Sequence, residues 1–363
     1  MSVDERIKNL RREIENLDEK ILGHLNERAK IAQQVSNVKS EIQMDSYVPQ
    51  REEEILQRLE RRNSGPFPKS AVSSVFREIM SACRSLEAEL KVAYLGPPAT
   101  HTHLAVIKHF GSSACAAPQD SFQDIFEAVD REKVSLGIVP IENSIEGSVG
   151  PTLDLLIDFD VKICGEILSR VSHDLLSKTG EARNIQKIYS HPQALGQCRQ
   201  WLQKSFPQIP LVETMSTARA AEIASEDATV GAIATSFASQ LYGLKAVTSR
   251  IEDYSQNYTR FLILSRKKRG PTGKDKTSIL FSIPHTPGSL FRALEAFSQK
   301  GVNLTKIESR PLKGKPWEYI FFLDFQGHTE DVNIGEAMTA LKKNALFVKC
   351  LGSYPRSSSE ETE

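Results

Sequence analysis

The sequence of 363 residues predicts three consecutive domains: an all-α bundle, a larger α/β domain and a small α+β domain. Three observations lead to this prediction. Apolar residues recur at helical spacing in the first 90 residues, short apolar runs alternate with helical segments through the middle, and a new strand and helix pattern follows a basic stretch at 266–276. We place the domains at 1–90, 91–268 and 276–355, and expect 356–363 to be a disordered tail.

The first domain begins with one unusually long helix. Residues 4–41 contain no proline and one glycine. Their apolar residues lie on one helical face, at Ile7, Leu10, Ile14, Leu17, Ile21, Leu25, Ala32 and Val35. A helix of this length extends roughly 57 Å at 1.5 Å per residue, so other helices or a second copy of the chain must cover the stripe. With further helices expected over 49–62 and 70–91, the pattern predicts an intertwined bundle.

Two cations interrupt this apolar stripe. Arg28 and Lys39 project into the apolar arc, and Arg11 lies at its edge. A buried unpaired charge is unfavourable, so each needs an anion. Internal salt bridges to Glu52 or Asp18 are one interpretation. The other is a small ligand with several carboxylates, because helix bundles build ligand sites from side chains on facing helices.

The segments at 10–20, 27–28, 38–39 and 49–56 resemble the all-helical chorismate mutases, and the similarity covers residues 1 to about 90. The resemblance implies an intertwined homodimer in which chorismate is held by Arg28, Lys39, Arg51, Glu52 and the partner's Arg11. It implies a pericyclic rearrangement to prephenate, which needs positive charge near the breaking ether bond and no nucleophile or cofactor.

Three positions depart from the best-known pattern of that family. Val48 stands where an aspartate occurs, Cys83 where a serine does, and Glu87 where a glutamine donates to the ether oxygen. Glu87 can donate only when protonated, so burial would have to raise its pKa above the usual value of about 4.3. We therefore expect mutase activity to fall as pH rises. Alternatively, Glu87 points to water.

The middle domain contains the most informative stretch of the chain, at 137–150. An apolar strand pattern there breaks into a dense polar turn that begins with Glu142, Asn143 and Ser144. In open α/β sheets, ligands bind beyond the carboxyl ends of strands, where these residues would lie. An ordinary polar loop is the alternative on this segment alone.

Four polar clusters of this kind follow predicted strands, at 96–102, 142–144, 190–198 and 257–261. In this order and spacing they resemble prephenate dehydratase over roughly 92–266. That family has a two-lobed α/β fold like that of periplasmic binding proteins, with its site between the lobes. The resemblance implies loss of carbon dioxide and water from prephenate to give phenylpyruvate, with no cofactor. No metal is expected, since His101 and His103 lack helical metal-ligand spacing.

The resemblance makes Thr259 the candidate that hydrogen bonds or protonates the leaving hydroxyl, and Arg260 a candidate carboxylate clamp. A neutral threonine is a weak acid, so this role requires a relay or strong polarisation. The other positions implied for the cleft are Asn143, Ser144, Thr100, Thr102, Ser190 and Gln197.

After the basic stretch, the pattern of residues 278–351 predicts the order strand, helix, strand, strand, helix, strand, which is that of a ferredoxin-like sandwich. The segments 287–290 and 301–311 resemble an ACT domain attached to prephenate dehydratases, which implies an L-phenylalanine pocket at an interface between two ACT domains. The residues expected there are Gly288, Ser289, Leu290, Asn303, Leu304, Glu308, Ser309, Arg310 and Pro311. In a purely structural interpretation, Gly288 and Asn303 satisfy turns and Glu308 pairs with Arg310.

These resemblances indicate a bifunctional enzyme that converts chorismate to prephenate and prephenate to phenylpyruvate, with feedback inhibition by L-phenylalanine. Arogenate stays open as the dehydratase substrate. A mutase fused to a dehydrogenase would need a G-x-G-x-x-G fingerprint after a strand, and the sequence has none. A non-enzymatic amino-acid sensor would need an output module, and the first domain shows no basic recognition helix.

Composition agrees with this interpretation. Lysine plus arginine equals aspartate plus glutamate at 46 each, so no overall charge favours nucleic acid or a membrane as partner. The first twelve residues lack the apolar core of a secretory signal, and no run of about eighteen apolar residues occurs. Five scattered cysteines indicate reduced thiols. We therefore expect a cytoplasmic protein.

Overall fold

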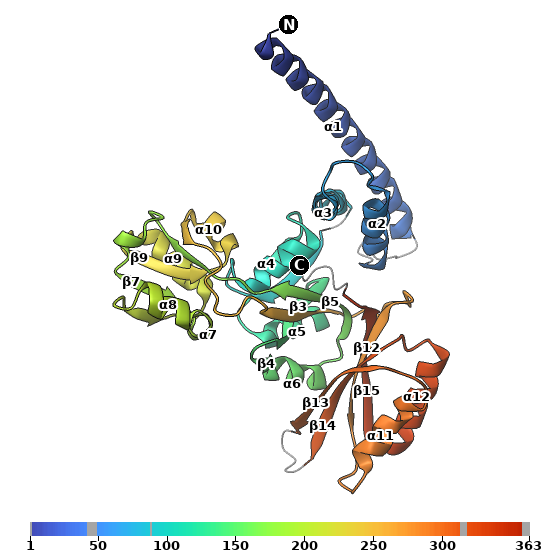
Figure 1. Ribbon diagram of the computed structural model, residues 1–363. Coiled ribbons are helices and arrows are strands. Elements are labelled where there is room, and N and C mark those ends of the chain that lie inside the picture. Colours follow the sequence, from blue (N-terminus) through green and yellow to red (C-terminus); the bar gives the residue numbers. More distant parts are fainter. Residues whose placement is uncertain (1, 42–48, 88, 313–317, 358–363) are drawn as a thin grey trace. The chain divides into compact units, whose positions relative to one another are not determined.

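The computed structural model describes residues 2–41, 49–87, 89–312 and 318–357, and the chain divides into two compact units (Figure 1). The first, called the helical unit below, comprises Met1–Leu90 with Ile107–Cys115. The second comprises Lys91–Val106 with Ala116–Glu363. Most of the predicted tail lies outside the described residues.

Three helices form most of the helical unit, as the apolar spacing predicts: α1 (Val3–Glu41), α2 (Pro49–Arg62) and α3 (Lys69–Ser85). Pro49 is the first residue of α2, and Pro68 directly precedes α3. The fixed φ of proline suits a helix start, where its missing N–H has no intrahelical acceptor to lose. Leu56 of α2 and Val72 and Met80 of α3 are buried.

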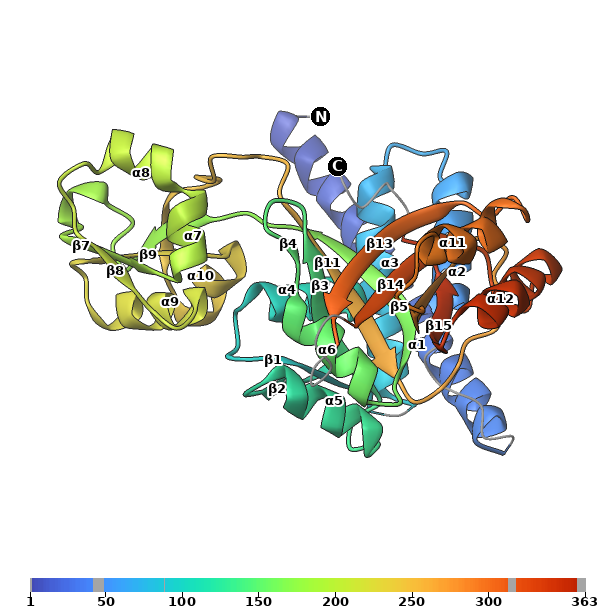
Figure 2. The same cartoon turned by 90° about the horizontal axis from the view of Figure 1, so that it is seen from below.

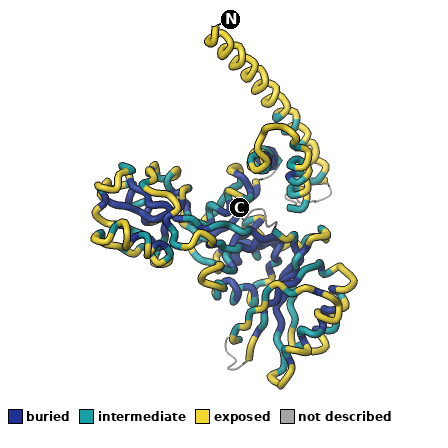
Figure 3. The backbone as a smooth tube through the Cα atoms, in the orientation of Figure 1, coloured by how far each residue is buried: buried dark blue, intermediate teal, exposed yellow. Residues whose placement is uncertain are grey.

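Most of α1 lies in solvent in the single chain (Figure 3). Its apolar stripe is exposed along nearly the whole helix: Leu17 is 55% exposed, and Leu10, Ile14 and Ile21 are similarly open. An apolar stripe of this length is unusual on the surface of a monomeric protein.

The second unit contains two separate sheets of the predicted α/β domain (Figure 2). Lobe 1 has the strand order β2-β1-β3-β11-β5, with β4 paired to β3. Its elements are β1 (Lys91–Leu95), α4 (His101–Phe110), β2 (Cys115–Gln119), α5 (Phe122–Asp130), β3 (Leu136–Asn143), β4 (Gly147–Ser148), α6 (Gly150–Asp158), β5 (Lys162–Arg170) and β11 (Tyr258–Ser265).

Lobe 2 has the strand order β10-β6-β9-β7-β8. Its elements are β6 (Asp174–Ser177), a 3-10 helix (Ala182–Asn184), β7 (Lys187–Ser190), α7 (Pro192–Gln197), α8 (Arg199–Ser205), β8 (Leu211–Glu213), α9 (Thr217–Glu226), β9 (Val230–Ala234), α10 (Ser236–Tyr242) and β10 (Lys245–Thr248). The chain enters lobe 2 between Arg170 and Asp174 and returns to lobe 1 between Thr248 and Tyr258. The two-lobed prediction is confirmed.

The C-terminal domain has the predicted ferredoxin-like order, with its sheet arranged as β13-β14-β12-β15. Its elements are β12 (Asp275–Ser282), α11 (Ser289–Ser298), β13 (Leu304–Pro311), β14 (Tyr319–Gln326), α12 (Val332–Asn344) and β15 (Phe347–Pro355). One face of this sheet packs on α11 and α12 through Ile279, Phe281, Leu323 and Phe325.

The other face of the same sheet joins the core of lobe 1. Leu280, Phe322 and Tyr354 belong to the hydrophobic cluster that includes Leu262 of β11 and Ile163 of β5. The backbones approach closely here, because a Cβ built on Gly352 would lie 2.1 Å from the carbonyl oxygen of Ile163. The basic stretch at 266–276 thus joins two parts that share one core.

Candidate active sites

A buried ion pair joins α2 to α3 in the helical unit. Arg84 Nη1 donates to Glu52 Oε1 at 2.8 Å, and Arg84 Nη2 donates to the backbone carbonyl of Phe110 at 2.7 Å. The Arg84 side chain is 6% exposed. Glu52, which the sequence suggested as a salt-bridge partner of Arg28 or Lys39, therefore pairs with Arg84 instead.

Two charged groups near this ion pair have unsatisfied atoms. Among the described residues, Nη1 of Arg28 and Oε2 of Glu87 are buried and have no hydrogen-bond partner. Lys39 is half-buried and acts electrostatically on both Glu52 and Glu87. Buried polar atoms are costly until something satisfies them, so this cluster is suited to a small ligand that carries both carboxylates and ether or hydroxyl oxygens.

Burial shifts the titration of both glutamates in this cluster in the same direction. It raises the pKa of Glu52 and of Glu87 above the ordinary glutamate value. Arg84, Lys39 and Arg28 oppose this shift without cancelling it. The direction agrees with the requirement that Glu87 hold a proton in order to donate a hydrogen bond.

The structure accounts differently for the remaining positions considered for this site. Cys83 is buried in α3. Arg11 is exposed on the solvent-facing part of α1, and Val48 lies outside the described residues. Arg51 is exposed and donates to Glu54 at 3.3 Å.

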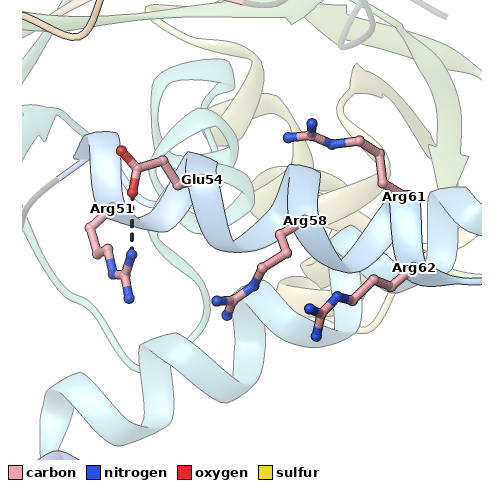
Figure 4. Close-up of a pocket in the computed structure, with 5 residues that line it drawn as sticks. All are labelled: Arg51, Glu54, Arg58, Arg61 and Arg62. Atoms are coloured by element: carbon pink, nitrogen blue, oxygen red, sulfur yellow. Dashed lines mark hydrogen bonds and ion pairs between the residues drawn. The ribbon is translucent and has the colours of Figure 1, made fainter.

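Arg51 instead lines an open hollow of about 410 Å³ on α2 (Figure 4). The other lining residues are Glu54, Arg58, Arg61 and Arg62. Only Arg51 is shared with the predicted site. The single chain therefore brings Arg28, Lys39, Glu52 and Glu87 together, and leaves Arg11 and Arg51 on its surface.

In the second unit, Asn143 at the end of β3 is held by its own backbone turn. Its Oδ1 accepts hydrogen bonds from the backbone N–H groups of Ile145 at 3.0 Å and Glu146 at 3.1 Å. Its Nδ2 must therefore be the donor to Thr259 Oγ1 at 3.0 Å and to Asn257 Oδ1 at 2.8 Å. Because Thr259 accepts this bond, its own hydroxyl hydrogen can be donated to another group.

The same series of hydrogen bonds continues into lobe 2. Asn257 Nδ2 donates to Gln197 Oε1 at 3.1 Å, and Gln197 Nε2 donates to Glu146 Oε1 at 3.0 Å. His173 Nε2 lies 2.9 Å from the same Gln197 oxygen and must carry the proton of that contact. Burial lowers the pKa of His173, although its bond to Gln197 opposes the shift, so the imidazole is neutral at pH 7.

The other positions predicted for the cleft are hydrogen-bonded or buried within the protein. Thr100 Oγ1 accepts a backbone N–H in the first turn of α4, and Thr102 is buried in the same helix. Ser144 Oγ accepts the backbone N–H of Tyr258 at 2.9 Å. Ser190 is fully buried and donates to a backbone carbonyl of β9 at 2.7 Å.

Arg260 follows Thr259 on β11, and its side chain lies on the opposite face of the strand. Its Nε donates to Glu166 Oε2 at 2.9 Å, and its Nη2 donates to Asp324 Oδ2 at 2.6 Å. The predicted carboxylate clamp thus holds carboxylates of the protein itself.

Comparison with known proteins assigns a family to each part of the chain. Chorismate mutase type II matches residues 10–88, prephenate dehydratase matches 92–269 and the ACT domain matches 277–343. A bifunctional chorismate mutase/prephenate dehydratase of Aquifex aeolicus is 46% identical over 361 residues, which are 98% of this chain and 100% of the relative. The chain belongs to the bifunctional chorismate mutase/prephenate dehydratase family.

Solved structures resemble the dehydratase and ACT parts of the chain. A prephenate dehydratase of Arthrobacter aurescens in complex with L-Phe is 32% identical, with a TM-score of 0.68 over 73% of this chain and 90% of that one. GqqA, described as a quorum-quenching acylase, is 30% identical, with a TM-score of 0.69 over 74% of this chain and 99% of that one. Because one fold carries both descriptions, the family assignment rests on the full-length relative.

None of the helices in the described part of the chain is long and apolar enough to span a membrane.

The ACT residues predicted to bind the effector divide between two faces. Glu308 and Arg310 of β13 face the dehydratase part, where Glu308 accepts from Ser148 Oγ at 2.8 Å and Arg310 Nε donates to Asp154 at 3.0 Å. Glu308 and Arg310 therefore bind partners in the dehydratase part, whereas the structural interpretation of the sequence paired them with each other.

Ser309 and Pro311 alternate with these residues and are exposed on the face that carries α11. Gly288 precedes that helix with φ of +79°, a backbone conformation that disfavours other residues. Ser289 is buried beside it, Leu290 and Leu304 pack against the core of this face, and Asn303 is exposed at the entry to β13. Glu308 and Arg310 are therefore the two predicted effector residues that lie on the other face.

Four residues of the two sites were missed by sequence reasoning: Arg84, Glu146, His173 and Asn257. Asn257 opens the Asn-Tyr-Thr-Arg-Phe motif, so its position was a usable signal. Arg84 follows the seam residue Cys83, but a cation at that position is usually solvent-exposed.

Replacement of Glu87 by glutamine tests whether mutase activity depends on a proton carried by Glu87. Glutamine donates at every pH, whereas Glu87 donates only while protonated, and burial raises its pKa so that this form persists to higher pH. The mutase kcat/KM of the wild-type protein should fall by about tenfold per pH unit once the pH exceeds that pKa. In Glu87→Gln this limb should be flat.

Chorismate consumption, followed from pH 4 to 9 in both proteins, gives the profiles. The dehydratase rate of the same preparations serves as the control, since Glu87 belongs to the helical unit. Identical mutase profiles would exclude Glu87 as the titrating donor.

Proposed function

We propose that the helical unit converts chorismate to prephenate with Arg28, Lys39, Glu52 and Glu87, and that the dehydratase part converts prephenate to phenylpyruvate with Thr259 and Asn143. The observation that carries the second assignment is the fixed hydrogen bond from Asn143 Nδ2 to Thr259 Oγ1. Since Thr259 Oγ1 accepts this bond, its hydroxyl hydrogen can be donated to a substrate.

The mutase step requires no covalent catalysis. The ether carbon–oxygen bond of chorismate breaks as a carbon–carbon bond forms, and the ether oxygen gains electron density in the transition state. Arg28 and Lys39 supply positive charge, and protonated Glu87 supplies a hydrogen-bond donor, at a site where Nη1 of Arg28 and Oε2 of Glu87 are buried. Preorganised donors at such an oxygen stabilise the transition state more than the substrate.

The dehydratase step requires help for a departing hydroxide. The ring carboxylate of prephenate leaves as carbon dioxide, its bonding electrons enter the ring, and hydroxide leaves from the opposite ring carbon as the ring becomes aromatic. The Thr259 hydroxyl stabilises that hydroxide by a hydrogen bond, and solvent supplies the proton that completes the water molecule. Because Asn143 donates to Thr259 Oγ1, the threonine hydrogen is more polarised than that of an isolated alcohol.

Both activities can be tested by incubating the protein with chorismate alone. Phenylpyruvate should appear without added nicotinamide or metal, and Thr259→Val should accumulate prephenate while its mutase rate stays unchanged. Loss of one donor to a developing oxyanion lowers kcat by roughly 10²- to 10³-fold.

Thr259→Ser keeps the hydroxyl and is the matched control, for which we expect a small loss. Arogenate is assayed beside prephenate, because its amino group is the alternative to the prephenate ketone. Formation of phenylpyruvate by Thr259→Val at the wild-type rate would refute the role of the hydroxyl. A preference for arogenate would identify arogenate, in place of prephenate, as the substrate of the dehydratase part.

We also propose that the mutase works as an intertwined homodimer. The exposed stripe of α1 needs a cover, and the predicted contribution of Arg11 needs a second chain because Arg11 lies on that exposed helix. Each site would then combine Arg28 of one chain with Arg11 of its partner.

Complementation between inactive variants tests this arrangement. Arg11→Ala and Arg28→Ala should each lose mutase activity, and co-expression of the two chains should restore about a quarter of the wild-type activity, because half of the dimers are mixed and each holds one intact site. The dehydratase rate normalises the amount of protein. Absence of restored activity in mixed dimers that are verified by two affinity tags would place both arginines in a site within one chain.

L-Phenylalanine is proposed as the inhibitor that binds the ACT domain on the face shared by Gly288 and Ser309. Inhibition requires that the amino acid bind the less active arrangement of the dehydratase better than the active one. This part of the proposal rests on the ACT assignment and on the A. aurescens complex with L-Phe.

Ser309→Ala separates inhibition from catalysis. Its side chain is exposed and lies on the face of β13 away from the dehydratase part, so kcat should be preserved. Loss of one hydrogen bond to the charged amino acid should raise the inhibitory concentration by about tenfold. Thr339→Ala on the exposed side of α12 is the control, and an unchanged inhibition curve for Ser309→Ala would remove Ser309 from the pocket.

A cytoplasmic location is proposed as well. All five cysteines are free thiols, and three of them are buried. Reduced thiols are the rule in the cytosol and uncommon among exported proteins.

A further inference from the structure

The Arg260 side chain lies at the junction between the dehydratase part and the ACT domain and is only 12% exposed. Three carboxylates surround its guanidinium: Glu166 at 2.9 Å, Asp324 at 2.6 Å and Glu142 at 3.6 Å. Its Nη2 also donates to the hydroxyl of Tyr354 at 3.2 Å. Asp324 and Tyr354 are ACT residues, so a guanidinium of the Thr-Arg-Phe motif is bound from both domains.

The ACT side of this contact is a closed ring of hydrogen bonds. Tyr354 accepts from Arg260, so its own hydrogen goes to Ser278 Oγ at 2.7 Å, and Ser278 donates in turn to Asp324 Oδ1 at 2.6 Å. Asp324 Oδ2 closes the ring on Arg260. Burial raises the pKa of Tyr354 well above its usual range, so the hydroxyl keeps the proton that the ring requires.

The charged side chains of this junction balance in number. Lys276 donates to both oxygens of Glu166, at 2.7 and 2.8 Å. Lys306 of β13 shares Glu142 with Arg260, at 2.9 Å from its carboxylate. Among these side chains, three cations face three anions. Buried pairs of this kind hold a defined geometry, because removing one partner leaves an uncompensated charge.

The geometry of β11 connects this junction to the proposed reaction. Thr259 pairs with Asn143 of β3, and the next residue, Arg260, pairs with Glu142. Consecutive side chains of a strand point to opposite faces, so Thr259 faces the Asn143 cluster while Arg260 faces the ACT sheet. A shift of the ACT sheet that pulls on Arg260 would therefore move the peptide group adjoining Thr259.

We propose that Arg260 is a positioning residue of the dehydratase, held by the hydrogen-bond ring of Asp324, Ser278 and Tyr354, which sets the orientation of the Thr259 hydroxyl without itself contacting prephenate. The inference rests on the proposed role of Thr259. It assigns to three ACT residues a part in the dehydratase rate that is distinct from binding an effector.

Tyr354→Phe opens the ring with the loss of a single oxygen. The dehydratase kcat should fall by about 3- to 30-fold while the KM for prephenate stays within about twofold, because the binding groups are intact and one orienting bond is lost. Tyr319→Phe, in strand β14 of the same sheet and 40% exposed, is the matched control and should match the wild-type protein. The mutase rate of the same chain reports the amount of folded protein.

Arg260→Lys distinguishes positioning from direct binding. A lysine keeps the charge but lacks the planar fork that reaches Glu166 and Asp324 together, so we expect the same fall in kcat with little change in KM. A rise of tenfold or more in KM with kcat preserved would identify Arg260 as a substrate ligand and overturn the inference. Should Tyr354→Phe prove insoluble, Ser278→Ala opens the same ring and carries the same expectation.

The outcomes separate this inference from the proposed function. If Thr259→Val is inactive and both Tyr354→Phe and Ser278→Ala have wild-type kcat and KM, the positioning role is wrong and the role of Thr259 stands. If Thr259→Val retains wild-type activity, the proposed role of Thr259 fails, and the positioning role fails with it.

Discussion

The two-residue alternation of a single strand, β11, governs the dehydratase part of this protein. Because neighbouring side chains must point to opposite faces, the Thr-Arg-Phe motif places a hydroxyl on one side of the sheet and a guanidinium on the other. The hydroxyl of Thr259 meets Asn143, and the guanidinium of Arg260 meets Asp324 and Glu166. One short segment therefore serves both a candidate reaction site and a domain junction. The same alternation divides β13, whose Glu308 and Arg310 face the dehydratase while Ser309 faces the helices of the ACT domain.

Hydrogen-bond direction is the second constraint. Two backbone N–H groups fix which end of the Asn143 amide accepts and which donates. The orientations of the Asn257 and Gln197 amides follow from it, and Gln197 in turn determines which nitrogen of His173 carries the proton. The weak acidity of threonine is thereby partly offset, since Thr259 can accept from Asn143 and still donate. The electrostatics of the helical unit differ, because there burial raises the pKa of Glu52 and Glu87 while nearby cations oppose the shift. Each site is adjusted by its surroundings to a reaction that needs no cofactor in the proposed mechanism.

Much of the architecture could be predicted from sequence patterns. Apolar spacing located α1 to within one residue at its start, and strand and helix order identified the ferredoxin-like domain. Prediction was weaker at helix ends: the third helix stops at Ser85, although apolar periodicity continues to Leu90. The pairing of Glu52 with Arg84 could not be predicted, because it depends on how α2 and α3 cross. The contact of Arg260 with Asp324 joins residues 64 positions apart and could not be read from either motif.

The sequence by itself determined the domain order, the family and the kinds of chemical groups available, because periodicity and motif spacing are local properties of the chain. Only the tertiary structure decided which groups meet. It turned Arg260 toward carboxylates of the protein, added Asn257 and His173 to the Thr259 cluster, and merged the ACT sheet with the core of lobe 1. The physical reason is that a buried charge or amide takes whichever partner the packed core brings within about 3 Å, and that partner is set by the crossing of distant strands and helices.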